Sequence, residues 1–258
     1  MATLNAAYGI IVRDLTRTTR QTSRLLGGIA RPFMWLLLVG TGYNAIARLE
    51  GNLSYQSFVY PGIIVMAALF GAMLTAISTV YDREFGMLRL MLASPAGAPA
   101  VLAGRAVAAA LIGFLQGAIV LACAPLVVSV QLWTLIAGAG SLSLASLSSS
   151  VLGLLVAVRL KSVENFAGVI NVVLFPLLFV SGALYPTRGM PPVLRLLARA
   201  NPVTYQVDLM RHDFGQPVEF SVQLDILVLV LVTLVVFGLT ALLFDSEQRF
   251  IPRRAATC

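Results

Sequence analysis

The sequence has 258 residues, of which 59% are hydrophobic and only 11% are charged, and its mean hydropathy is +0.90. Soluble domains carry about a quarter charged residues, so this composition excludes an ordinary soluble protein and favours a polytopic membrane protein. The net charge of +7 would suggest nucleic acid as the partner of a soluble protein. Here the basic residues gather between apolar runs, so we expect membrane lipids, and no nucleic acid, as their partners.

Residues 4–26 are predicted to form an amphipathic helix before the first apolar run. Its basic residues recur at spacings of four, three and four positions, which places them on one helical face: Arg13, Arg17, Arg20 and Arg24. Such a helix suits the headgroup layer of a membrane, with its arginines facing anionic lipid. The alternative is a solvated N-terminal helix without membrane contact.

Six apolar runs are long enough for a helix to cross a bilayer, which requires roughly 20 residues. They cover residues 32–47, 57–80, 106–130, 133–158, 166–185 and 222–244. The first begins at Pro32, which is tolerated in the first turn of a helix. The fourth is rich in serine between residues 138 and 150, which indicates either close helix packing or a serine-lined translocation surface. We therefore predict an all-α polytopic membrane protein with six transmembrane helices, forming a single transmembrane domain over residues 1–258.

The connectors differ in their content of basic residues. Arginine and lysine number 13 on the side that holds both termini and 5 on the opposite side. The positive-inside rule then places both termini in the cytoplasm, and an even number of spans agrees with that placement.

A charged segment, residues 82–93, separates the second apolar run from the third. It is predicted to form a short amphipathic helix on the cytoplasmic side, ended by Ser94-Pro95. Its apolar stripe consists of Phe85, Leu88 and Leu92, and its charged residues are Asp82, Arg83, Glu84 and Arg89. The segment either docks on a soluble partner or lies in the headgroup region without one.

The connector between the fifth and sixth runs, residues 186–216, is predicted to contain short re-entrant helices. Pro191-Pro192 precede one helical stretch, and Asn201-Pro202 separate it from the next. Irregular backbone at membrane depth must be surrounded by protein or by a water-filled cavity, so this region is a candidate outer gate. The candidate gate residues are Tyr185, Pro186, Asn201, Pro202 and Tyr205. The alternative is a surface cap that does not enter the membrane.

Patterns of catalytic and metal-binding residues are not found. The single histidine, His212, is followed by Asp213 and is interpreted as part of a polar loop. Neither an HExxH or CxxC pattern nor a phosphate-binding glycine loop with lysine occurs, so we expect no catalytic residue, no metal site and no cofactor in this chain. The middles of the runs hold no acid or base for ion coupling, so any energy for transport must come from outside the chain.

Two segments resemble the membrane subunits of type 2 ABC exporters, the permease family that includes drug-resistance, nodulation-factor and polysaccharide exporters. They are EFGMLRLMLASPAGAPAVLAGR, residues 84–105, and PLLFVSGALYPTRGMPPVLRLLARANPVTYQVDLMR, residues 176–211. The order of elements is similar from residue 4 to residue 250. The resemblance implies an interfacial helix at 4–26, a coupling helix at 82–93 that docks on an ATPase, and outer short helices at 186–216.

The resemblance also implies partners and an activity. Such permeases are not enzymes; they work as homodimers or heterodimers in the bacterial inner membrane and bind two cytoplasmic ATPase subunits that hold ATP and Mg²⁺. The implied function is ATP-driven export, including multidrug efflux, of a hydrophobic or amphipathic substrate such as a drug or lipid. The alternatives are export of a lipid-linked glycan or polysaccharide and, from other classes, a passive channel or a membrane-embedded enzyme.

Overall fold

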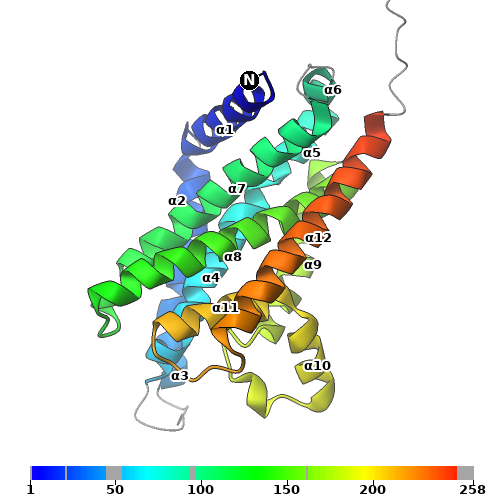
Figure 1. Ribbon diagram of the computed structural model, residues 1–258. Coiled ribbons are helices and arrows are strands. Elements are labelled where there is room, and N and C mark those ends of the chain that lie inside the picture. Colours follow the sequence, from blue (N-terminus) through cyan, green and yellow to red (C-terminus); the bar gives the residue numbers. More distant parts are fainter. Residues whose placement is uncertain (1, 21, 45–53, 93–96, 161, 249–258) are drawn as a thin grey trace, which may run out of the picture.

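The computed structural model describes residues 2–20, 22–44, 54–92, 97–160 and 162–248, and all its regular elements in those ranges are helices (Figure 1). Five helical segments are long and apolar enough to cross a membrane: Tyr55–Glu84, Gly97–Leu126, Leu132–Arg159, Val163–Val180 and Val222–Phe244. A shorter apolar helix, Leu26–Gly40, corresponds to the first predicted run. The all-α polytopic fold predicted from the sequence is therefore confirmed.

The helices follow one another with short connections. The N-terminal part contains α1 (Ala2–Arg20), α2 (Thr22–Trp35), the π-helical turn η1 (Leu36–Gly40) and α3 (Thr41–Asn44). The middle contains α4 (Tyr55–Thr75), α5 (Ile77–Glu84), α6 (Met87–Leu92), α7 (Gly97–Ala122), η2 (Ala124–Leu126) and α8 (Leu132–Arg159). The last part contains α9 (Val163–Val180), η3 (Thr187–Gly189), α10 (Pro192–Ala200), α11 (Pro202–Asp213) and α12 (Val222–Gln248).

Several predicted boundaries are wrong. The amphipathic helix expected over 4–26 ends at Arg20, and residues 22–26 already belong to α2. Pro32 lies inside α2 and not in a first turn, and the π-helical turn η1 follows it. The helix of the third run begins at Gly97 instead of 106, and that of the fifth ends at Val180 instead of 185. Residues 45–47 of the first run lie outside the described residues.

The core is built around α4, which packs against α7 and α8. Small residues allow the close approach: a methyl group on Gly113 of α7 would lie 2.7 Å from the carbonyl oxygen of Ala68 and 2.9 Å from the Ala72 methyl on α4. By contrast, α9 and α12 leave large apolar side chains exposed, among them Val172, Leu227 and Leu234. This distribution matches a bundle whose outer helices face lipid.

The serine-rich stretch of α8 is packed inside the protein. Its serines at 146, 148, 149 and 150 are fully buried. Ser149 donates a hydrogen bond of 3.3 Å to the side-chain oxygen of Gln206 on α11. Of the two interpretations of this stretch, the structure supports close packing and not a serine-lined surface.

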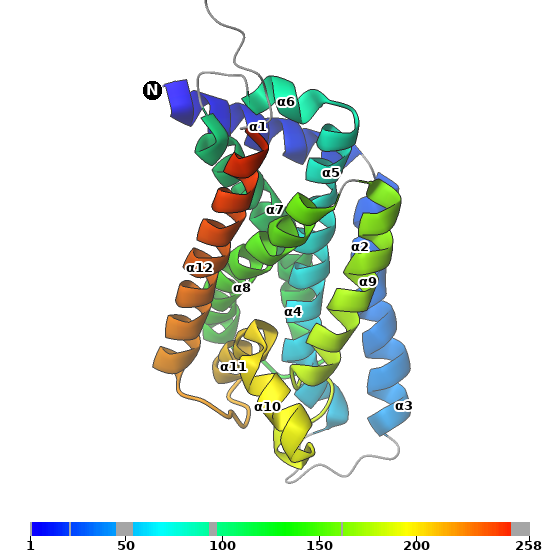
Figure 2. The same ribbon diagram turned by 90° about the vertical axis from the view of Figure 1, so that its right-hand side faces the viewer.

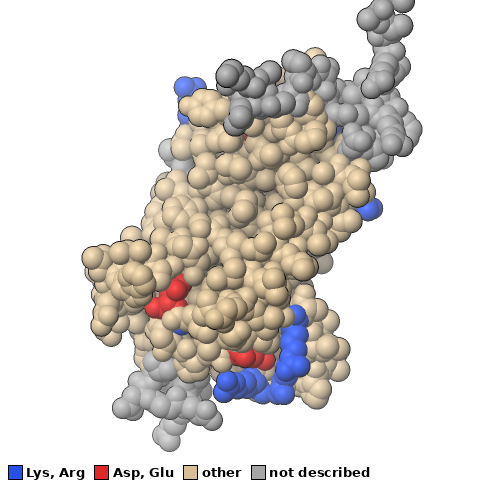
Figure 3. All heavy atoms as spheres, in the orientation of Figure 1, with Lys and Arg blue, Asp and Glu red and all other residues tan. Residues whose placement is uncertain are grey.

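Short helices cover the two ends of the bundle. In Figure 2, α1 lies across one end beside α6, and α10 and α11 lie at the opposite end. The start of α1 and the end of α12 lie at the same end (Figure 1). The broad middle of the face in Figure 3 is almost free of charged side chains, as expected where a helix bundle meets hydrocarbon. We refer below to the α1–α6 end and the α10–α11 end.

Candidate functional site

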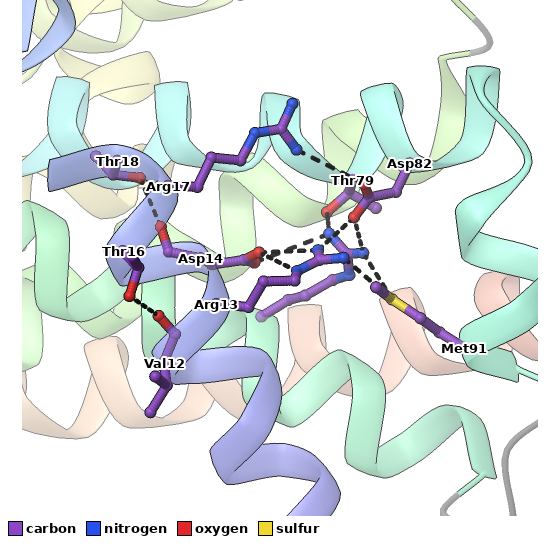
Figure 4. Close-up of polar contacts among 10 residues, drawn as sticks. Val12, Arg13, Asp14, Thr16, Arg17, Thr18, Thr79, Asp82 and Met91 are labelled. Carbon is purple, nitrogen blue, oxygen red and sulfur yellow. Dashed lines mark hydrogen bonds and ion pairs between the residues drawn. The ribbon is translucent and has the colours of Figure 1, made fainter. Parts of the chain in front are cut away.

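Asp82, in the last turn of α5, is the centre of an ionic cluster at the α1–α6 end (Figure 4). Its Oδ2 atom accepts hydrogen bonds of 2.5 Å from Arg105 Nη2 on α7 and of 2.5 Å from Arg13 Nη2 on α1. Arg17, one turn further along α1, lies 3.6 Å from Oδ1. One buried carboxylate therefore ties α5 to α1 and to α7. We call Arg13, Asp14, Arg17, Asp82 and Arg105 the Asp82 cluster.

Arg105 joins four helices. Its side chain is 1% exposed, which requires nearby partners for the charge. Besides Asp82, its guanidinium donates to Thr79 Oγ1 at 3.2 Å on α5 and contacts Met91 Sδ at 3.4 Å on α6. Its Nη1 atom also lies 4.0 Å from Asp14 of α1. Movement of α6 is thus linked through a single side chain to α1, α5 and α7.

Asp14 supports the cluster from α1. Its Oδ1 atom accepts hydrogen bonds from Arg13 Nε at 3.1 Å and Nη2 at 2.9 Å. Burial alone would lower the pKa of Arg13, but the hydrogen bond from Asp82 and the negative charge of Asp14 outweigh it and raise that pKa. The guanidinium therefore stays charged where it bridges the two carboxylates.

Arg83 and Glu84 extend the connections of α5 to two further helices. Arg83 Nη1 donates to the carbonyl oxygens of Ala157 at 3.0 Å and Leu160 at 2.6 Å, at the C-terminal end of α8. Glu84 Oε2 accepts from the backbone N–H of Val163 at 3.2 Å, at the N-terminus of α9. Each charge has the sign that the helix end favours. The last turn of α5 thus contacts the ends of α8 and α9 as well as α1 and α7.

The predicted amphipathic helix over 82–93 is two helices. Residues 82–84 belong to α5, and a turn at Phe85 and Gly86, whose φ is +75°, leads into α6. Because of this turn, Phe85 and Leu88 do not share the predicted stripe: Phe85 is 76% exposed and Leu88 is 2% exposed. The side chains of Arg89 and Leu92 and the stop at Ser94-Pro95 lie outside the described residues.

Leu88 seats α6 in the bundle, and other apolar residues point outwards. Leu88 belongs to a buried cluster with residues of α1, α7, α8 and α12: Ile10, Ala98, Val101, Val158 and Phe244. The outward residues are Phe85, Met87 and Leu90, at 76%, 47% and 69% exposure. We call these three the exposed corner. It is an apolar surface attached to a firmly packed helix.

The basic face predicted on α1 does not point away from the protein as a whole. Arg13 and Arg17 turn towards Asp82, and Arg17 also lies over the Tyr81 ring, 5.3 Å from its centre. Arg20 is exposed, and the side chain of Arg24 lies outside the described residues. The prediction that all four arginines face lipid headgroups is therefore wrong for Arg13 and Arg17, because a buried carboxylate is a stronger attractor than hydrated lipid phosphate.

Two members of the Asp82 cluster, Asp14 and Arg105, were not among the predicted site residues. A signal for Arg105 is present, because a charge within the apolar sequence VLAGRAVAA needs an opposite charge nearby. Asp14 lies one turn after Ile10 and one turn before Thr18, and all three are buried. That spacing marks the face of α1 turned towards the bundle.

The candidate gate residues anchor the connector at the α10–α11 end. Asn201 caps α11 through the Val203 N–H at 3.0 Å and donates from Nδ2 to the Leu177 carbonyl of α9 at 2.6 Å. Pro202 starts α11, and Tyr205 donates its hydroxyl proton to the Arg199 carbonyl at 2.7 Å. Pro186 precedes η3 and Tyr185 is 38% exposed. Nothing in these contacts tests a gating role.

The turn after α9 is held from the core. Arg211 of α11 is buried; its Nη2 atom donates to the Gly182 carbonyl at 2.6 Å, and its guanidinium lies 4.4 Å from the centre of the Phe58 ring. Burial lowers the pKa of Arg211 to about 10. Tyr55 donates to the Leu184 carbonyl at 2.7 Å. The connector is thus packed against α4 and does not stand free.

Comparison with known proteins identifies the family. The sequence profile of the family described as "ABC-2 type transporter" matches residues 6–214. The chain is 30% identical over 216 residues to the "Putative transport permease ycf38" of Cyanophora paradoxa, covering 81% of this chain and 73% of the relative. It is 28% identical over 197 residues to "Nodulation protein J" of Rhizobium leguminosarum bv. trifolii, covering 75% of each chain. It is 32% identical over 200 residues to the "Probable multidrug ABC transporter permease YbhR" of Escherichia coli (strain K12), covering 74% of this chain and 50% of the relative.

These relatives are transport permeases, which are membrane subunits without enzymatic activity, and the family implies association with an ABC ATPase. The helices of this chain agree with such a subunit, since several of them are able to cross a membrane by length and composition. The chain therefore belongs to the ABC-2 type transporter family, as an integral, multi-pass permease subunit of an ABC transporter.

Proposed function

We propose that this permease is the membrane subunit of an ATP-driven exporter in the bacterial inner membrane, with the α1–α6 end and both termini in the cytoplasm. The excess of basic residues in the connectors at that end supports the orientation. Two cytoplasmic ATPase subunits supply ATP and Mg²⁺, and a second permease, either identical or related, completes the transporter. The chain itself then works without a cofactor.

The observation that carries the proposal is the connection between the exposed corner and the Asp82 cluster. The corner offers an apolar surface of Phe85, Met87 and Leu90 to a soluble partner. Behind it, Met91 contacts Arg105, and Arg105 binds Asp82 at the end of the helix pair α4–α5. An ATPase that pushes on the corner moves α6, and the ionic cluster passes that displacement to the most deeply buried helices of the bundle.

The proposed substrate is hydrophobic or amphipathic, such as a drug or a lipid. The printed description of YbhR as a probable multidrug permease supports a drug, and the uncharged middle of the described spans suits an apolar molecule. "Nodulation protein J" keeps a glycan-containing substrate as the alternative. Release at the α10–α11 end requires the connector to separate from α4 and α9, which Asn201 and Arg211 now hold together.

Reconstitution with an ABC ATPase from the same organism tests the proposal. The permease and the ATPase should co-purify, and inside-out vesicles should accumulate a hydrophobic dye when ATP is added. A lipid-linked glycan in the same assay provides the substrate alternative. Dye movement that proceeds equally without ATP would indicate a passive channel, and failure of every ABC ATPase to co-purify would contradict the proposed partnership.

A further inference from the structure

Asp208, His212 and Asp225 meet at the α10–α11 end, in a group that we call the acid–histidine cluster. Asp208 and His212 lie one turn apart on α11, and Asp225 lies in the first turn of α12. One candidate ligand atom from each residue lies within 4.8 Å of the other two. Residues 208 and 212 have the spacing that places two side chains on one helical face, so the helix itself presents them to α12.

The cluster contains buried negative charge without a matching positive charge. Asp208 is 2% exposed and Asp225 is fully buried. Both Asp225 carboxylate oxygens lack a hydrogen-bond donor among the described residues, and Oδ2 lies 3.5 Å from His212 Nε2. Even a protonated His212 would balance only one of the two carboxylates. A carboxylate this deeply buried requires a cation or a proton.

The neighbouring arginine does not supply that charge. Arg211 points its guanidinium at the Gly182 carbonyl and over the Phe58 ring. No ion pair joins it to either aspartate of the cluster within the described ranges. The charge of the cluster is therefore not balanced by the surrounding side chains.

The backbone orients the ligands. Asp208 accepts hydrogen bonds from the backbone N–H groups of Glu219, at 3.0 Å, and Phe220, at 2.8 Å, which fixes the direction of its carboxylate. The Phe220 carbonyl oxygen lies 3.1 Å from His212 Nε2 and so stands beside the same space. Ligand carboxylates in metal sites are commonly held in this way by outer hydrogen bonds.

The cluster is reachable from outside the protein. His212 is 22% exposed at its side chain and lines an open recess together with Gln131, Trp133, Thr134 and Asp213. An ion entering through this recess meets the imidazole first and the two buried carboxylates behind it. The site thus combines an entry path with a buried, unpartnered carboxylate.

We propose that the acid–histidine cluster binds one divalent transition-metal ion, with zinc as the reference ion. An imidazole nitrogen and two carboxylates are common zinc ligands, whereas magnesium prefers oxygen ligands and retains several waters. The bound ion neutralises both carboxylates with His212 neutral. It joins the end of α11 to the start of α12, and so ties the outer connector to the last spanning helix. This inference rests on these residues and not on the direction of transport.

Zinc binding to the purified full-length chain tests the proposal. The protein is prepared in nanodiscs with Cys123→Ser and Cys258→Ser, which remove adventitious thiol ligands, and is stripped with a chelator. After addition of zinc chloride and desalting, elemental analysis should find about one zinc per chain. At a zinc concentration about 100-fold above the dissociation constant, the melting temperature should rise by on the order of 5–10 °C. Magnesium at the same concentration should leave it unchanged.

Variants separate this site from other zinc-binding positions. Asp225→Asn and His212→Gln should each lose the bound zinc and the thermal shift. Asp213→Asn, a matched change beside the cluster, should retain both. Without metal, Asp225→Asn should melt above the parent, because it removes a buried unpaired charge; this readout distinguishes lost binding from failed folding. A parent that does not respond to zinc, while Asp225→Asn still melts higher, would show that a proton balances the charge and would overturn the proposal. So would zinc binding that survives Asp225→Asn and His212→Gln.

Discussion

The carboxylate of Asp82 lies 2.5 Å from the guanidinium of Arg105, and these side chains are only 8% and 1% exposed. The pair connects the end of α5 to the first half of α7, on the side where α1 and α6 cross the bundle. Removing one partner from a buried pair leaves the other charge unsatisfied, which is more damaging than removing both. The pair therefore lends itself to a double-mutant cycle.

Asp82→Ala should destabilise the protein by about 3–5 kcal/mol, because Arg105 then remains buried without its main counter-charge. Arg105→Met alone should also destabilise, since Asp82 keeps only the partly exposed Arg13 and Arg17. The double variant should lose less than the sum of the single variants, which thermal unfolding of the purified protein measures. Additive losses would contradict a direct interaction. Glu84→Gln, at an exposed position, serves as the control and should lose about 1 kcal/mol or less.

The exposed corner should determine coupling to the ATPase. Phe85→Ser combined with Leu90→Ser removes apolar surface that is not packed inside the chain, so insertion and thermal stability should stay near those of the parent. Co-purification of the ATPase and ATP-dependent transport should fall about tenfold or more, as expected when central apolar contacts of an interface are removed. Leu196→Ser on α10, equally exposed at the opposite end, is the matched control. Equal transport in both variants would place the docking surface elsewhere.

Periodicity and hydropathy were sufficient to predict the class of fold. The runs at 133–158 and 222–244 match α8 and α12 closely, because uninterrupted apolar residues leave little choice but a spanning helix. The boundaries failed where local rules compete with tertiary packing. Pro32 suggested a helix start, yet neighbouring helices hold the chain helical on both sides of it.

The candidate site was predicted only in part. Asp82, Arg83 and Glu84 were identified as an important group, but as polar contacts of a surface helix. Their partners are 69 to 79 residues away in sequence, as for Arg13 with Asp82 and Val163 with Glu84, so no local pattern reveals them. The turn at Gly86 similarly exchanged the faces of Phe85 and Leu88. A single sequence indicates which charges are unusual, whereas tertiary structure decides what they bind.

Gly113 should not tolerate even one added methyl group. A Cβ atom there would lie 2.7 Å from the backbone oxygen of Ala68, which cannot move without shifting α4. Gly113→Ala should therefore destabilise by about 1–3 kcal/mol, measured by thermal unfolding. Gly140→Ala in α8, where a Cβ meets nothing within 4 Å, should be neutral or stabilising by up to about 1 kcal/mol. Equal stabilities of the two variants would mean that α4 and α7 are less closely packed.

Asn201 should hold the outer connector by two separable hydrogen bonds. Its side-chain oxygen caps α11 at the Val203 N–H, and its side-chain nitrogen donates to the Leu177 carbonyl of α9. Asn201→Ala loses both, so the free energy of unfolding should fall by about 1–3 kcal/mol. Asn201→Asp keeps the capping oxygen but cannot donate when ionised, and its charge then faces the carbonyl of Leu177.

A protease that cleaves at exposed arginine can monitor this connector in the folded protein, because Arg195 and Arg199 lie on α10. Both variants should be cleaved faster than the parent, since both lose the bond to α9. Only Asn201→Ala should also weaken the start of α11, which hydrogen exchange of the Val203 amide reports. If Asn201→Asp resists cleavage as well as the parent, the bond to Leu177 does not hold the connector. Anchorage would then rest on Arg211 and Tyr55, and Arg211→Gln should accelerate cleavage in the place of Asn201→Asp.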